Sequence, residues 1–202
     1  RRSARKAASP PRALTPCAGK ITRASKRVIL RSWITDDTFD QSGQYHDRNF
    51  GSLYLWLRSQ NYEVWILPMF FNLTMGREKA YALMKRAKCA FVVPEHFLKF
   101  WDYIAILINS YKGFTKVVRE AYIQGVNVSP LFNEVLRRNG FNVHLSLLNT
   151  SSLLLKRLKS EGFEVDGFYY PFESNSPENQ FVVSCRWYFP QAQSIGFQHT
   201  TL

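Results

Sequence analysis

The 202-residue chain is 46% hydrophobic, which is enough to bury one good-sized core, so its length fits one domain or slightly more. Its formal charge of +12 is concentrated at the N-terminus, because residues 1–31 hold ten Lys and Arg and no acidic residue, leaving 17 basic and 15 acidic residues, about +2, elsewhere. Three widely separated cysteines exclude a disulfide framework and a metal-ligand spacing, and they fit a reducing cytoplasm. The sequence contains no run of about 18 apolar residues, so it predicts no membrane-spanning helix.

Residues 1–27 form the basic tail. They combine three prolines and many small residues with almost no large apolar ones, so burial cannot offset the entropy of ordering them, and we expect disorder. The tail lacks the apolar segment of a secretory signal, although its Arg, Ser and Ala content is similar to that of an organellar transit peptide. Translated upstream sequence and a basic arm that contacts phosphates or anionic lipid are the other interpretations.

Alternating apolar and polar segments follow the tail. A short strand at 27–30 and a polar, turn-rich loop at 35–49 come first. Two helix–strand pairs come next, and each strand precedes a proline that we expect to end it. Their predicted ranges are a helix at 51–60, a strand at 62–67 before Pro68, a helix at 77–88 and a strand at 90–93 before Pro94.

The middle of the chain is strongly apolar. Residues 96–111 are long for a strand, so they predict one helix, which either packs in the core or lies in the plane of a bilayer with Lys99, Lys112 and Lys116 beside its aromatic side chains. A further helix is expected over 115–139, with Gly140 as its C-terminal cap.

The last third contains two more strand–helix units and a closing strand. The predicted elements are a strand at 141–147, a helix at 151–160 with Gly162 as its stop, a strand at 167–170, a helix at 177–188 and a strand at 194–198. This alternation predicts an α/β fold over residues 28–202: a Rossmann-like, mostly parallel sheet of about six strands with helices on both faces.

Glu173 and His199 both follow strand ends. In open α/β sheets ligands bind outside the carboxyl ends of the strands, where loops converge and helix N-termini point inward, so these two side chains are candidates for a site. Each also has an ordinary interpretation, as a solvated loop acid or the start of a helix for Glu173 and as a loop histidine for His199. Spacing does not decide between these interpretations.

Two motifs resemble those of bacterial surface-carbohydrate biosynthesis proteins. The segment FYYPFESNSPENQ, followed by SIGFQHTTL, is similar to their Tyr-Pro-Phe-Glu stretch before a helix and their Gly-Tyr-Gln-His stretch at the end of the next strand. The segment from Arg31 to Pro68 resembles their opening strand, Asp-Arg loop and Gly-led helix. Residues 174–179 depart from the family pattern, which leaves the role of Glu178 open.

The resemblance implies one half of a GT-B-like glycosyltransferase, namely the N-terminal, acceptor-side domain, with the donor-binding half expected beyond Leu202. Sugar would pass from a nucleotide-sugar to a glycan or a lipid-linked acceptor, with His199 as base or phosphate contact and Glu173 as the competing base. Asp47, Arg48, Gln198 and Thr200 would bind substrate. The resemblance implies no metal and no cofactor beyond the nucleotide-sugar donor, because a helix dipole with Arg or Lys can stabilise the leaving diphosphate.

Other functions stay open. The chain could be a non-catalytic, truncated remnant, or its tail could bind nucleic acid or a membrane surface, although we do not expect a nucleic-acid partner. It has no Gly-x-Gly-x-x-Gly, P-loop or Gly-x-Ser-x-Gly motif, which argues against a self-sufficient nucleotide enzyme and an α/β-hydrolase. The expected location is the cytoplasm, with the inner face of the membrane as an option.

Overall fold

The computed structural model describes residues 26–87, 89–115, 117–139, 143–173 and 176–198. Its elements, in chain order, are β1 Arg27–Ile34, α1 Leu53–Ser59, β2 Glu63–Phe70, α2 Arg77–Arg86, β3 Ala90–Phe91, α3 Pro94–Phe97, α4 Phe100–Thr115, β4 Tyr122–Ile123, β5 Val126–Asn127, α5 Ser129–Asn139, α6 Val143–Ser160, β6 Gly167–Pro171, α7 Ser176–Tyr188 and β7 Gln193–Phe197.

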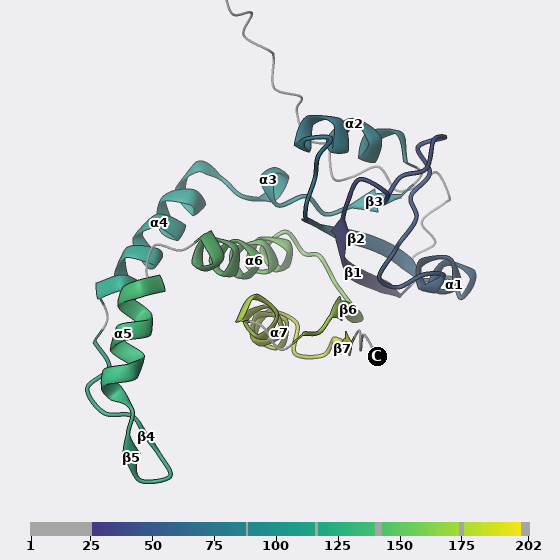
Figure 1. The fold of residues 1–202 in the computed structure, drawn as a ribbon. Coiled ribbons are helices and arrows are strands. Elements are labelled where there is room, and N and C mark those ends of the chain that lie inside the picture. Colours follow the sequence, from purple (N-terminus) through teal and green to yellow (C-terminus); the bar gives the residue numbers. More distant parts are fainter. Residues whose placement is uncertain (1–25, 88, 116, 140–142, 174–175, 199–202) are drawn as a thin grey trace, which may run out of the picture.

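Five of these strands form one parallel sheet in the order β3-β2-β1-β6-β7 (Figure 1). The chain first builds outward from β1 to β3, then returns to the other side of β1 and continues outward to β7. The order therefore reverses between β1 and β6. This confirms the predicted α/β, Rossmann-like sheet, with five strands instead of about six.

Helices cover both faces of the sheet because its strands are apolar on both sides. Ile29, Trp65 and Phe168 face α6 and α7, and they pack with Leu154, Leu158 and Phe181 of those helices. Val28, Leu30 and Ile66 face the opposite layer, where they pack with Leu57 of α1 and Met84 of α2. Strands buried on both faces are typical of parallel sheets, and they explain why these segments are apolar runs.

Pro68 does not end β2, contrary to the prediction, and the strand continues to Phe70. The Ile66 carbonyl accepts the Val92 N–H, so Ile66 directs its backbone groups toward β3. Pro68, two residues on, directs its nitrogen to the same side, but β3 ends at Phe91 and leaves no partner there for an N–H. The missing donor therefore costs β2 nothing at this position.

The single helix predicted over 96–111 is wrong, because the chain breaks between α3 and α4. Leu98 is extended, and the Asp102 carboxylate accepts the Lys99 N–H at 2.7 Å, as in half of a capping box. Asp102 thus starts α4 as a new helix.

The single helix predicted over 115–139 is also wrong. Between α4 and α5 lies the hairpin β4–β5, whose turn residues Gln124 and Gly125 both have positive φ, 49° and 81°. Two such residues define a type I′ turn, which forces the flanking residues into antiparallel strands. The predicted cap, Gly140, lies outside the described residues.

The strand predicted at 141–147 is wrong, because α6 is one helix from Val143. Its Leu154, Leu155 and Leu158 are fully buried and anchor it on the sheet. Adding turns of leucine-rich sequence to an anchored helix costs less than starting a new strand. Helix α6 ends at Ser160, and Gly162, with a φ of +76°, is its stop as predicted. The Phe163 N–H donates to the Leu158 carbonyl and the Gly162 N–H to the Lys159 carbonyl, which is a Schellman motif.

The remaining predictions for the last third are confirmed: β6, α7 and β7 lie within one or two residues of their expected ranges. The predicted disorder of the tail concerns residues 1–27, of which 1–25 lie outside the described part. Among the described residues, no helix combines the length and apolarity needed to cross a membrane.

Candidate functional site

The candidate site lies where the strand order reverses, between β1 and β6. Paired residues of these strands end at Leu30↔Tyr169, whereas β1 stays paired with β2 to Ile34 and β6 with β7 to Pro171. The carboxyl halves of β1 and β6 thus have no ladder between them. Ligands of open α/β folds bind at such a switch point.

Asp47 organises the loop that follows β1. Its carboxylate is buried, and it accepts hydrogen bonds from the Ser32 hydroxyl at 3.1 Å, the Tyr45 hydroxyl at 2.6 Å and the N–H groups of Asn49 and Phe50, both at 2.9 Å. Burial and the nearby Asp47 charge raise the pKa of Tyr45, so its hydroxyl remains a donor. Because these bonds join Asp47 to β1 and to its own loop, the contacts of Asp47 fit a positioning role.

The loop after β1, which Asp47 organises, reaches the end of β7. The ring of Phe50 packs edge-on against Phe197, with centroids 5.4 Å apart, and the Phe172 N–H donates to the Phe197 carbonyl at 2.7 Å. The ends of β1, β6 and β7 therefore meet at one edge, which we call the carboxyl edge. Three segments predicted from the sequence as site segments, around Asp47, Glu173 and Gln198, converge there.

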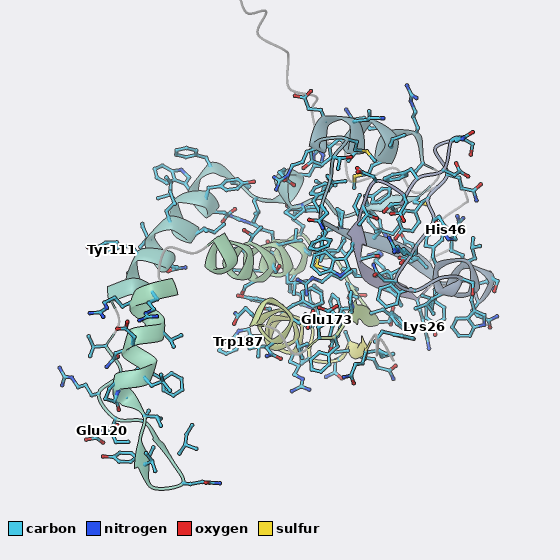
Figure 2. All side chains as sticks on the ribbon, in the orientation of Figure 1. Lys26, His46, Tyr111, Glu120, Glu173 and Trp187 are labelled. Atoms are coloured by element: carbon cyan, nitrogen blue, oxygen red, sulfur yellow. The ribbon has the colours of Figure 1, made fainter. Side chains whose placement is uncertain are left out.

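Glu173 follows β6 at the carboxyl edge, near the N-terminal end of α7 (Figure 2). Its side chain is exposed, and it has no hydrogen bond or ion pair to another residue in the described part of the chain. Its backbone N–H donates to the Glu178 carboxylate at 2.6 Å. Glu178, in the first turn of α7, thus fixes the backbone of Glu173 and leaves the Glu173 carboxylate open to solvent.

A buried cation of β1, Arg31, interacts electrostatically with Glu178. Arg31 of β1 is 5% exposed, and its guanidinium lies over the ring of Phe181 at 4.7 Å. Burial lowers the pKa of Arg31 to about 10, and the negative charge of Glu178 opposes that shift. Arg31 Nη1 has no hydrogen-bond partner among the described residues. Arg31 and Glu178 therefore place opposite buried charges on β1 and α7, and these charges attract one another.

The other acidic residues after β1 hold loops together. Asp36 accepts the N–H groups of Thr74 and Met75 at 3.0–3.1 Å and so ties this loop to the one after β2. The Thr74 hydroxyl, bonded to the same carboxylate, does most to lower the pKa of Asp36. Arg48 is exposed and forms a surface ion pair with Asp37 at 3.1 Å.

Two of the predicted site residues, His199 and Thr200, lie outside the described residues. Gln198 is exposed at the end of β7, beside Phe197. The described part of the chain contains no cluster of three His, Cys, Asp or Glu side chains arranged to hold a metal ion.

Comparison of the chain with models of known protein families and with curated proteins gives no significant match.

Arg31 was not predicted from the sequence as a site residue, and Glu178 was left without a role. The signal for Arg31 was present: a charged residue inside the otherwise apolar run from Val28 to Ile34. A charge at such a position is rarely fully buried unless it is paired. Its partner, 147 positions along the chain, could not be recognised before the sheet order was known.

Proposed function

We propose that this chain is the acceptor-side domain of a glycosyltransferase of surface-polysaccharide synthesis. It would help to transfer a sugar from a nucleotide-sugar to a glycan or a lipid-linked acceptor, in the cytoplasm or at the inner face of the membrane. The convergence of the family-like segments at the carboxyl edge carries this proposal. Segments 47–50, 172–173 and 197–198 come from different parts of the sequence, yet they meet where α/β folds bind ligands.

Glu173 is the described residue best suited to act as a base. Its carboxylate is exposed at the carboxyl edge, while Glu178 holds its backbone. An acceptor hydroxyl would lose its proton to Glu173 or to His199 as it attacks the anomeric carbon, and the nucleoside diphosphate would leave with the electron pair of the broken bond. Asp47 and the pair of Arg31 and Glu178 would position the loops.

Sugar transfer by the product of the whole reading frame tests the proposal. A panel of nucleotide-sugars is incubated with free and lipid-linked glycans, and release of nucleoside diphosphate is measured. We expect Glu173→Gln and His199→Ala each to lower turnover by about 10² or more, the usual range for loss of a general base.

Glu161→Gln is the matched control. Glu161 is an exposed glutamate at the end of α6, before the amino end of β6, so the same substitution lies at the opposite edge of the sheet and should leave turnover unchanged. Wild-type turnover in both site variants would remove the site assignment. Absence of transfer with every donor would favour the alternative of a non-catalytic remnant.

A further inference from the structure

Helix α4 exposes a continuous apolar stripe. Phe100, Leu107 and Tyr111 are 56–69% exposed, and their i, i+7, i+11 spacing places them on one face of the helix. Trp101 and Ile108, 73% and 47% exposed, widen this face on one side. We call these five residues the α4 stripe.

The opposite face of α4 attaches the helix to the body of the protein. Asp102 and Ile106 are buried there. The Asp102 carboxylate forms a bidentate ion pair with Arg157 of α6, whose Nε and Nη2 lie 2.9 and 2.8 Å from the two carboxylate oxygens. The orientation of α4 is thereby fixed, with the stripe turned away from α6. Figure 1 shows α4 leading into an arm with α5 and the hairpin β4–β5, and Figure 2 shows Tyr111 out on this arm, far from Glu173.

Basic side chains flank the stripe. Lys99 and Lys112 are exposed, and at 3.6 residues per turn they project roughly a third of a turn to either side of its centre. The single acidic residue of α4, Asp102, lies on the buried face in its ion pair. The exposed surface of α4 is thus apolar and aromatic in the middle and positive at both margins.

We propose that the α4 stripe lies in the headgroup region of an anionic phospholipid membrane. A helix with an apolar, aromatic face between lysines binds in the plane of the interface, where its rings enter the acyl boundary and its lysines reach anionic headgroups. The inference does not depend on the proposed function.

Charge also argues against a second copy of the chain as the occupant of the stripe. Two stripes packed face to face would bring Lys99 and Lys112 of one copy toward those of the other, and α4 offers no exposed acidic partner for them. An anionic lipid surface carries the charge opposite to that of the same lysines.

Binding of the full chain to vesicles tests this proposal. Vesicles of phosphatidylcholine with phosphatidylglycerol, part of it carrying brominated acyl chains, are mixed with the protein, and tryptophan quenching and co-sedimentation are measured. We expect quenching of Trp101 with anionic vesicles and little with phosphatidylcholine alone. Lys99→Gln with Lys112→Gln should weaken binding about 25-fold, since each lysine near an anionic surface contributes about a factor of five.

Two tryptophan variants separate the stripe from other sources of binding. Trp101→Ser should abolish most quenching and weaken binding about tenfold, whereas Trp187→Ser, at a tryptophan of α7 that is 76% exposed, should change neither. Equal quenching in the wild type and Trp101→Ser would overturn the proposal, because another segment such as the tail would then hold the vesicle. The proposal would also be overturned if the protein formed a dimer that does not bind vesicles and that Leu107→Asp converts to a monomer.

Discussion

At the residue scale, the loop after β1 depends on one carboxylate. Asp47 accepts four hydrogen bonds in a buried position, and each would leave a donor unsatisfied if the carboxylate were removed. We expect Asp47→Ala to lower the free energy of unfolding by about 2–4 kcal/mol, since a buried unsatisfied group costs about 1–3 kcal/mol and the donors can partly relax. Urea unfolding followed by circular dichroism measures it.

Asp47→Asn is the control for this prediction. It keeps one oxygen for Ser32 and the two backbone donors, and its amide can donate to the Tyr45 hydroxyl, so the loss should be about 1 kcal/mol or less. Equal destabilisation by Ala and Asn would show that the negative charge, not the hydrogen bonds, holds the loop.

The pair of Arg31 and Glu178 is the second residue-scale feature with a measurable consequence. Glu178→Ala removes the buried charge that opposes the desolvation of Arg31 and leaves the Glu173 N–H without its acceptor, so we expect the free energy of unfolding to fall by about 1–3 kcal/mol. The double variant Arg31→Met with Glu178→Met removes both charges and should recover most of this loss. A double variant less stable than Glu178→Ala would contradict the pairing.

At the element scale, the glycine before Phe197 is required by packing. A Cβ on Gly196 would lie 3.2–3.3 Å from the Tyr170 ring of neighbouring β6 and 3.0 Å from the Cβ of Phe172, which directly follows that strand. We expect Gly196→Ala to lower the free energy of unfolding by about 1–3 kcal/mol, as overpacking does, and to move the Phe172–Glu173 segment. Thermal unfolding and the amide shift of Glu173 report the two effects.

Gly167→Ala provides the comparison, because its Cβ would meet its nearest neighbour, Val28, at an ordinary 3.5 Å. Gly167→Ala should lower the free energy of unfolding by clearly less than Gly196→Ala does. The reverse order would mean that the β6–β7 contact does not constrain the Glu173 segment.

The elements predicted correctly from sequence are those whose local signals and tertiary contacts agree. β1, α2, β6, α7 and β7 are apolar or periodic segments bounded by turn residues, and all of them belong to the sheet and its helical layers. Apart from β2, which continues past Pro68, the errors fall between β3 and β6. There, two short-range features override periodicity: the Asp102 hydrogen bond that starts α4 and the positive φ of Gln124 and Gly125.

At the scale of the whole molecule, the chain combines two surfaces with different chemistry. The carboxyl edge gathers polar side chains from loops distant in sequence, and the arm presents an apolar face with basic margins. Sequence alone could place Asp47 in the loop after the first strand, and Glu173 and Gln198 at strand ends. It could not show that Phe50 meets Phe197, because that contact depends on the return of the chain from β3 to β6.

The most direct measurement of the central claim is an amide chemical-shift map of the full chain during titration with oligosaccharide fragments of bacterial surface polysaccharides. We expect shifts confined to 47–50, 172–173 and 197–198, and weaker binding in Glu173→Gln than in Glu161→Gln. Shifts confined to other surfaces, or equal binding by the two variants, would contradict an acceptor site at the carboxyl edge.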